Sequence, residues 1–279
     1  MPKTSLIKMP ELPEVENICR FLKKKILKKQ ILSVSVRLDK IVKNNSYSFI
    51  KYLKGKSVSD VFRRGKFIII GLSNKYYLIT HLKISGQLLY LSKKEQAAKH
   101  THIIINFKNT EYQLRFKDVR QFGYMHIVKS NELEGFLASK IGPDFPDLPY
   151  KEFKAIVGSR KRIIKSLLLD QKLFSGIGNI YANEALFKAG VHPAALSSSL
   201  TQEQIKKLYS AINSILSEAI RMGGSSVDDY ILPDTSLGSF QNKHKVYQKE
   251  GGKCPRCSGI IERVKQNGRS SWFCSHCQK

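Results

Sequence analysis

The sequence CPRCSGIIERVKQNGRSSWFCSHC, residues Cys254–Cys277, determines the architecture of the C-terminal end. It holds two Cys-x-x-Cys pairs separated by 16 residues, and this spacing lets two tight turns wrap one tetrahedral Zn²⁺. The residues between the pairs are typical of two strands joined at Asn267-Gly268, a hairpin dipeptide. Four sulfur ligands leave no open coordination position, so we expect one structural zinc, bound by Cys254, Cys257, Cys274 and Cys277. Disulfides are the alternative, and they fit poorly in a cytosolic chain.

A hairpin braced by zinc is a rigid arm, and its turn carries Arg269. An arginine on such an arm suits a phosphate or a groove of nucleic acid, while the plainer interpretation is an ordinary surface arginine. The fifth cysteine, Cys19, lies on the apolar face of an expected helix and is interpreted as a core residue.

The whole chain is strongly basic. Lys and Arg number 48 against 22 Asp and Glu, which gives a net charge of +26 over 279 residues. The excess is spread along the chain and favours polyanionic partners, DNA or RNA before acidic membranes. A lysine-rich codon usage is the alternative explanation. No stretch approaches the roughly 20 apolar residues of a membrane span, and Lys8 interrupts the short apolar run near the N-terminus, so we expect a cytoplasmic protein with no membrane partner.

The first half of the chain has the pattern of a helix followed by a β-rich domain. From Pro13 to about Lys29, apolar residues recur at helical spacing, and Pro13 and Glu14 suit the first turn. Short segments rich in Ile, Val, Tyr and Phe follow between polar turns: ILSVSVRL, FRRGKFIIIGL, KYYLITHLKISGQLLYL, HTHIIINF and EYQLRF. They predict an antiparallel sandwich or barrel over about residues 31–130.

The second half changes to helical patterns after GPDFPDLPY, residues 142–150, which has three prolines and is typical of an extended linker. We expect a helix over 151–170 and another in IYANEALFKAG, after the turn SGIGN. A third helix begins after Thr201, with Gln204 completing a capping box, and ends at Gly223-Gly224. A polar, glycine-bearing loop is expected from there to Gly252.

Five motifs, read together, identify a family. They are MPELPEVE at 9–16, HLKISG at 81–86, DVRQFG at 118–123, GIGNIYANEAL at 176–186 and the four-cysteine hairpin. In this order they closely resemble the Fpg/Nei family of DNA glycosylases, and within it the branch that excises oxidised purines such as 8-oxoguanine. The resemblance covers Met9 to Lys279. Each motif is modest alone, but five in register are specific.

The resemblance implies an α+β fold of two domains. An N-terminal β-sandwich with a flanking helix precedes a helix–two-turn–helix domain and the four-cysteine zinc β-hairpin, and damaged double-stranded DNA lies between the domains. The expected boundaries are 9–135 for the catalytic β-sandwich domain, 136–150 for the linker, 151–224 for the helix–two-turn–helix domain, 225–249 for a lesion-capping loop and 250–279 for the zinc finger. A monomer with one Zn²⁺ is expected.

The resemblance also implies a chemistry. Pro10, as a chain-terminal secondary amine, would attack the sugar C1′ as the damaged base departs, and the resulting iminium would allow elimination of both flanking phosphates. Glu11 would act as the general acid/base that assists opening of the sugar ring. Lys66 matches a lysine near the lesion phosphate, and Arg269 matches the hairpin arginine of the second elimination. The plainer interpretations are charge stabilisation of the helix N-terminus for Glu11 and Glu14 and a surface cation for Lys66.

Further residues match DNA-contact positions of the family. Asn179 matches a phosphate ligand at a helix start; the other matches are His100, Arg120, Arg160 and Lys165. The flipped nucleotide leaves a void that Ile84, Arg120 and Phe122 would fill. Ile84 departs from the methionine usual in the family and is stiffer because it is β-branched. The loop over the flipped purine would read the base through Ser226, Val227, Asp228, Asp229 and Tyr230.

Two alternatives remain open. The Nei-type branch of the family acts on oxidised pyrimidines, although Leu12, NIYANEAL and the GSFQ loop favour the purine branch. The second alternative is a non-catalytic DNA-binding protein, because a proline nitrogen is nucleophilic only at a free chain end, and Met-Pro occurs at Met1-Pro2 as well as at Met9-Pro10. If Met1–Lys8 were retained, Pro10 would be an amide. We expect that the functional chain begins at Pro10.

Overall fold

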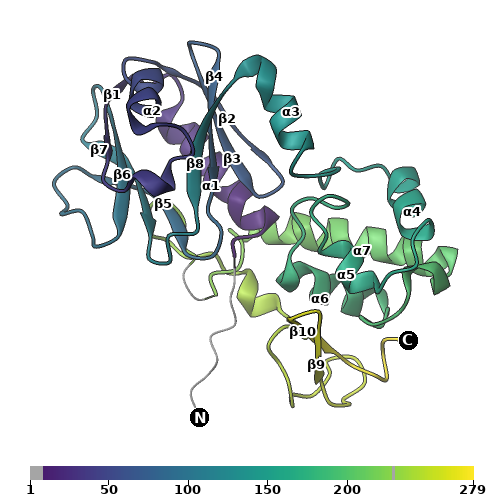
Figure 1. The fold of residues 1–279 in the computed structure, drawn as a ribbon. Coiled ribbons are helices and arrows are strands. Elements are labelled where there is room, and N and C mark those ends of the chain that lie inside the picture. The colour runs from purple at the N-terminus through teal and green to yellow at the C-terminus, as the bar shows by residue number, and fades with distance from the viewer. Residues whose placement is uncertain (1–8, 228–229) are drawn as a thin grey trace. The chain divides into compact units, whose positions relative to one another are not determined.

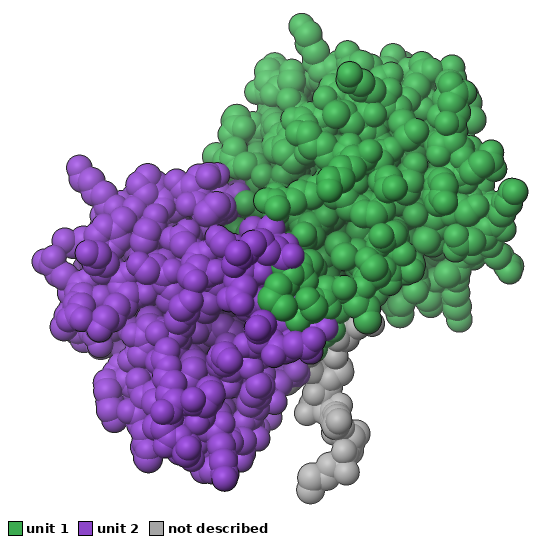
Figure 2. Space-filling model, turned by 180° about the vertical axis from the view of Figure 1, so that it is seen from behind, with its two compact units in different colours: residues 1–139, 222–239 green, residues 140–221, 240–279 purple. Residues whose placement is uncertain are grey.

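A computed structural model describes residues 9–227 and 230–279. The chain forms two compact units, coloured separately in Figure 2. Unit 1 contains the chain up to Ser139 together with Met222–Ser239, and unit 2 contains Lys140–Arg221 and Phe240–Lys279. The two-domain α+β fold is therefore confirmed. The division after Ser239 falls inside residues 225–249, the range expected for one lesion-capping loop. The exact domain boundaries stay a prediction.

Unit 1 is built on two antiparallel four-stranded sheets (Figure 1). The first has the order β2-β3-β4-β8, and the second has the order β1-β6-β7-β5. Their bounds are Val58–Arg64 (β2), Phe67–Leu72 (β3), Tyr76–His81 (β4), Tyr124–Lys129 (β8), Ile31–Val36 (β1), Thr101–Phe107 (β6), Tyr112–Asp118 (β7) and Gly86–Ser92 (β5). Apolar side chains of both sheets meet in one core, so the β-sandwich is confirmed.

Helix α1 (Leu12–Ile26) packs on β2 and β3 because its apolar residues recur on one side. Val15, Ile18, Leu22 and Ile26 are all at most 1% exposed. Short helices α2 (Ser46–Leu53) and α3 (Leu133–Ala138) and the 3₁₀ turns Asp39–Ile41 and Ser130–Glu132 complete the unit. Strand β8 and helix α2 were missed by the sequence pattern.

Unit 2 contains four α-helices and the zinc hairpin. Their bounds are Tyr150–Gly158 (α4), Ile164–Leu168 (α5), Asn179–Ala189 (α6), Gln202–Arg221 (α7), Glu262–Gln266 (β9) and Arg269–Phe273 (β10), with 3₁₀ turns at Ser197–Ser199 and Phe240–Lys243. The capping box is confirmed, since Thr201 N–H donates to Gln204 Oε1 at 2.9 Å and Gln204 N–H donates to Thr201 Oγ1 at 3.2 Å. No helix in the described ranges is both long and apolar enough to cross a membrane.

The single helix expected over 151–170 is wrong: it is broken between α4 and α5. The backbone there bonds to a distant segment, because Ser197 Oγ donates to the Arg160 carbonyl and Ile164 N–H donates to the Ala195 carbonyl at 2.8 Å. Tertiary hydrogen bonds therefore replace the continuous helix.

Candidate functional site

The start of α1 holds the predicted nucleophile and acid. Pro10 is buried, and Glu11 is buried as the N-cap residue of α1. The Glu11 backbone N–H donates to Glu14 Oε2 at 2.8 Å. A carboxylate at this position satisfies a backbone N–H that the helix leaves unpaired and interacts favourably with the positive end of the helix dipole. The geometry therefore fixes the direction of the main chain next to Pro10.

Glu14 also binds the loop that follows α7. Its Oε1 accepts the Ser225 N–H at 2.8 Å. Gly224 lies at a φ of +81°, and a Cβ there would come within 2.7 Å of Glu14 Oε1, so this close approach requires glycine. The Tyr230 hydroxyl donates to the Gly223 carbonyl at 3.2 Å. Burial, followed by the charges of Glu14 and Asp234, raises the pKa of Tyr230, which therefore stays a neutral donor. Glu14 thus links α1 to the predicted lesion loop.

The predicted lesion loop begins at this link. Ser226 Oγ accepts the Gly238 N–H at 2.8 Å, and Val227 N–H donates to the Ser225 carbonyl at 2.9 Å. Asp228 and Asp229 lie outside the described residues, as does the extension Met1–Lys8. The base-reading role of this loop stays a prediction.

Lys66 occupies the turn between β2 and β3 and is buried. The turn is held to α1 by Arg63, whose Nε lies 3.1 Å from Glu16 Oε2 and whose Nη1 donates to the Gly65 carbonyl at 3.1 Å. The sequence interpretation missed Arg63, although its buried guanidinium, paired with Glu16 of α1, is what orients the turn. Burial, followed by the charges of Lys83 and Lys66, lowers the pKa of His81 to about 3, so this ring is neutral.

The remaining predicted residues of unit 1 lie on three loops that meet at Asp118. Ile84 is half-buried, whereas Arg120 and Phe122 are exposed, with the guanidinium 5.5 Å from the centre of the phenyl ring. His100 adopts a φ of +65°, and its carbonyl accepts the Asp118 N–H at 3.0 Å. The structure therefore brings the three predicted void-filling residues and His100 onto one connected set of loops.

In unit 2, Arg269 and Lys165 line one cavity of about 200 Å³ together with Arg162. Arg269 is exposed, while Lys165 is buried. The Lys165 ammonium donates to the Ser270 carbonyl at 2.6 Å and to Ser271 Oγ at 2.7 Å. Lys165 thus holds the hairpin strand that carries Arg269; its predicted contact with DNA stays a prediction.

The other two predicted contacts of unit 2 lie at helix ends. Asn179 is the first residue of α6, at the positive end of the helix dipole, and its backbone carbonyl accepts Asn183 Nδ2. Arg160 follows α4, and its Nη1 donates to the Ile156 carbonyl at 3.1 Å. Both positions suit an anion, because one offers a dipole and the other a guanidinium.

The four cysteines form the metal centre. Sγ of Cys254 lies 3.8 Å from that of Cys277, and Sγ of Cys257 lies 3.5 Å from that of Cys274. All four sulfurs lie within 4.8 Å of one another. A tetrahedron with Zn–S bonds of about 2.3 Å requires sulfur separations of about 3.8 Å. The geometry therefore fits one Zn²⁺ with four sulfur ligands, and the disulfide alternative is wrong, since all four thiols are free.

Two buried polar residues of α6 hold the zinc hairpin and the segment that precedes it, and sequence reasoning assigned them no role. Asn183 Oδ1 accepts the Trp272 N–H at 2.9 Å. Glu184 accepts the backbone N–H groups of Lys245, Val246 and Tyr247 at 2.8–3.0 Å. Burial raises the pKa of Glu184, and these three bonds oppose the rise. The signal in the sequence was a polar pair inside the otherwise apolar helix IYANEALF.

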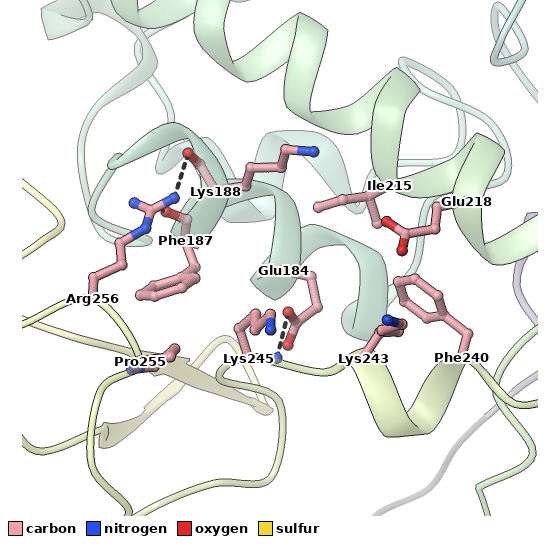
Figure 3. Close-up of a pocket in the computed structure, with 10 residues that line it drawn as sticks. All are labelled: Glu184, Phe187, Lys188, Ile215, Glu218, Phe240, Lys243, Lys245, Pro255 and Arg256. Atoms are coloured by element: carbon pink, nitrogen blue, oxygen red, sulfur yellow. Dashed lines mark hydrogen bonds between the residues drawn. The ribbon is translucent and has the colours of Figure 1, made fainter. Parts of the chain in front are cut away.

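Beside Glu184 lies a second cavity of unit 2, of about 390 Å³ (Figure 3). Two cationic side chains of this cavity are engaged within the protein. Arg256 Nη1 donates to the Phe187 carbonyl at 2.8 Å, with its guanidinium 4.4 Å from the Phe187 ring centre. Lys188 donates to Ser214 Oγ at 2.6 Å. The cavity therefore lies where the segment from Phe240 to Arg256 packs beside α6 and α7.

The sequence matches three family models in order. Residues 9–125 match the formamidopyrimidine-DNA glycosylase N-terminal domain, residues 141–230 match the formamidopyrimidine-DNA glycosylase H2TH domain, and residues 251–279 match a zinc finger found in FPG and IleRS.

Full-length relatives and solved structures agree with these matches. The formamidopyrimidine-DNA glycosylase of Listeria innocua is 42% identical over 275 residues, with 97% of this chain and 100% of the relative covered. That of Streptococcus pneumoniae is 38% identical, with 97% and 99% covered. The structure of Lactococcus lactis Fpg in complex with DNA containing an abasic site has a TM-score of 0.90 and 35% identity, with 96% and 99% covered. The complex of the same enzyme with DNA containing N7-benzyl-Fapy-dG has a TM-score of 0.90 and 36% identity, with 97% and 100% covered.

Proposed function

The chain belongs to the formamidopyrimidine-DNA glycosylase family, and from this premise we propose that it initiates base-excision repair of oxidised purines in double-stranded DNA. It removes 8-oxoguanine and formamidopyrimidines as a glycosylase and then cleaves the strand as an AP lyase. The observation that carries this proposal is the pair Pro10-Glu11, buried at the start of α1 in a chain that matches all three family domains.

The first step is a nucleophilic displacement at the sugar. The Pro10 nitrogen bonds to C1′, and the bond from C1′ to the damaged base breaks as the base leaves with a proton. The Glu11 carboxyl group protonates the ring oxygen O4′, so that the C1′–O4′ bond opens and a cationic iminium remains on the nitrogen. A free α-amino group titrates at about 7.7–8.0, and the positive end of α1 disfavours its protonated form. This placement keeps more of the nitrogen neutral and nucleophilic.

The second step uses the iminium as an electron sink. Loss of a proton from C2′ expels the 3′ phosphate, and a second elimination expels the 5′ phosphate. Lys66 and Arg269 are the cations assigned to these phosphates, and cations placed where negative charge develops lower the barrier. Asn179, Arg160 and His100 are assigned to the DNA backbone, and Lys165 holds the hairpin strand that carries Arg269.

The zinc ion supplies structure and no open coordination site for substrate. The four cysteines brace the hairpin β9–β10, and Asn183 and Lys165 join its second strand to α6 and α5. This bracing limits the positions available to Arg269, so the cation meets a phosphate without a large loss of conformational entropy.

The chemistry requires Pro10 to be the first residue, because only then is its nitrogen an amine. We therefore propose that the active chain lacks Met1–Lys8 and Met9. The same fold with those residues retained would bind DNA and cleave nothing.

A comparison of excision rates tests the proposed activity. The chain beginning at Pro10 and the chain retaining Met1 are each mixed in excess with duplexes that contain 8-oxoguanine or thymine glycol. We expect rapid release of 8-oxoguanine by the chain that begins at Pro10, slower release of thymine glycol, and no strand cleavage by the chain retaining Met1. Faster release of thymine glycol would favour the pyrimidine branch, and binding without release by both chains would favour a non-catalytic protein.

A further inference from the structure

Asp118 is a buried residue with several hydrogen bonds to neighbouring loops, and no functional role has been assigned to it. It is the last residue of β7, it is 0% exposed, and it pairs with Gly86, the first residue of β5. Its carboxylate accepts three donors: Oδ1 accepts the Ser85 hydroxyl and the Arg120 N–H, the latter at 3.2 Å, and Oδ2 accepts the Gly123 N–H at 2.7 Å. A carboxylate accepts all three bonds without a proton of its own.

The main chain of Asp118 joins a third segment. Its N–H donates to the His100 carbonyl at 3.0 Å, and its carbonyl lies 2.9 Å from His102 Nε2. Ser85 Oγ also accepts the Arg120 N–H at 2.9 Å. Three loops, before β5, before β6 and after β7, are thus tied to one residue.

These loops carry four of the residues assigned to DNA. Ile84 precedes Ser85, His100 offers the carbonyl, and Arg120 and Phe122 lie between the two backbone N–H groups that the carboxylate holds. The spacing is tight at Gly123, where a Cβ would come within 2.8 Å of Phe116 Cζ and 3.0 Å of Asp118 Oδ2.

Two apolar side chains on these loops are exposed beside Arg120. Val119 and Phe122 are 53% and 55% exposed, and the Arg120 guanidinium lies over the Phe122 ring. An apolar wedge opens a base stack only if it keeps its position when inserted, and rigid support reduces the entropy lost on insertion. Held at both ends by the Asp118 carboxylate, the segment from Arg120 to Gly123 has that support.

We propose that Asp118 is the positioning residue that holds Ile84, Arg120 and Phe122 together as one preformed wedge. It touches neither the sugar nor the leaving base. The inference rests on the proposed function, because a wedge is needed only by a protein that extrudes a nucleotide from duplex DNA.

Asp118→Asn tests this role with almost no change of volume. The amide nitrogen cannot accept a hydrogen bond, so either Gly123 loses its acceptor, or Ser85 loses its acceptor and the Arg120 N–H keeps only Ser85 Oγ. A displacement of about 1 Å at the wedge is expected to slow release of 8-oxoguanine from duplex DNA by about 100-fold. Cleavage of a single-stranded oligonucleotide with a preformed abasic site, which has no stack to open, should change by less than about threefold.

A fluorescent reporter makes the test independent of catalysis. Duplex DNA carries a tetrahydrofuran abasic analogue and a neighbouring 2-aminopurine, whose fluorescence rises when the stack is opened. The unsubstituted chain should raise this signal, and Asp118→Asn should not. If the unsubstituted chain raises the signal but releases no base, the proposed activity is wrong. The fluorescence of the two chains can still be compared, so the role of Asp118 is tested separately.

Two further variants guard against trivial outcomes. Asp39→Asn alters an exposed aspartate of the same unit, which accepts the Ser46 hydroxyl at 2.7 Å, and should behave as the unsubstituted chain. If Asp118→Asn does not fold, Ser85→Ala takes its place, because it removes the hydroxyl that donates to Asp118 Oδ1. It should also slow base release from duplex DNA more than cleavage of the single-stranded substrate, with a smaller difference between the two than in Asp118→Asn. The proposal would be overturned if Asp118→Asn slowed the reaction equally on both substrates, or if it raised the 2-aminopurine fluorescence as much as the unsubstituted chain does.

Discussion

The loops around Asp118 in unit 1 and the hairpin β9–β10 in unit 2 both present a cationic side chain, Arg120 and Arg269, yet they are held differently. In unit 1 a single buried carboxylate accepts hydrogen bonds from two loops, and its backbone N–H binds a third. In unit 2 four thiolates enclose a metal, and the second hairpin strand is held in addition by Lys165 and Asn183. In the first region most of the side-chain hydrogen bonds converge on one carboxylate, and in the second the support is distributed over several residues.

The difference has a physical reason. The loops of unit 1 leave strands of a large sandwich whose core is already stable, so they need only local alignment. The hairpin has two strands, and an isolated two-stranded hairpin is marginal in water. It therefore requires the metal, whose binding free energy is coupled to folding.

Loss of the metal should have the largest effect. Cys274→Ser removes a buried ligand, so we expect loss of zinc, loss of hydrogen-exchange protection over Glu262–Phe273, and a decrease in strand cleavage on the order of 100-fold because Arg269 is no longer positioned. Protection over Val119–Gly123 should stay unchanged. Zinc analysis, hydrogen exchange and cleavage of abasic-site DNA measure the three quantities.

A variant of Asp118 is the matched control, because it should affect the other region only. Asp118→Asn should reduce protection over Val119–Gly123 and leave Glu262–Phe273 protected and zinc bound. If either variant reduces protection in both regions, the two supports are not independent.

Lys165→Met should have an intermediate effect. The Ser270 carbonyl and Ser271 hydroxyl lose a charged donor, at a cost of about 1–3 kcal/mol, so we expect about tenfold slower cleavage at an abasic site with zinc retained. The salt dependence of DNA binding separates this role from a phosphate contact. The slope should be unchanged for Lys165→Met and reduced by about one for Arg269→Ala. A slope reduced equally in both would place Lys165 on DNA.

Asn267→Asp serves as the mild control for that variant. Asp tolerates the hairpin turn, but the Asn267 amide no longer donates to Ser166 Oγ, a bond of 2.9 Å at an exposed site. Cleavage should fall by less than about threefold. An effect as large as that of Lys165→Met would show that the tip, and not the buried ammonium, holds the arm.

Local patterns predicted much of the fold. The spacing of the cysteines predicts the zinc site, Thr201 and Gln204 predict the start of α7, and the apolar periodicity after Pro13 predicts α1. Each of these signals lies within a short segment, so no tertiary contact was needed to read it.

The missed features depend on contacts between distant segments. Lys165 stands in a basic run that is typical of an exposed surface, yet it is buried through bonds to residues more than 100 positions away. The motif DVRQFG indicates a loop after β7. That Ser85 and His100 both bind Asp118 follows from how β5, β6 and β7 pair, which the sequence pattern does not predict. The break between α4 and α5 likewise follows from bonds to Ala195 and Ser197.

Borohydride trapping, followed by mass analysis of the trapped peptide, tests most directly whether a freed proline nitrogen bonds to deoxyribose. The chain beginning at Pro10 is reduced while it acts on duplex DNA with 8-oxoguanine, beside the chain retaining Met1. We predict one covalent adduct, located at Pro10, in the first chain and none in the second. An adduct at a lysine such as Lys66, or equal trapping of the chain that retains Met1, would contradict the proposed chemistry.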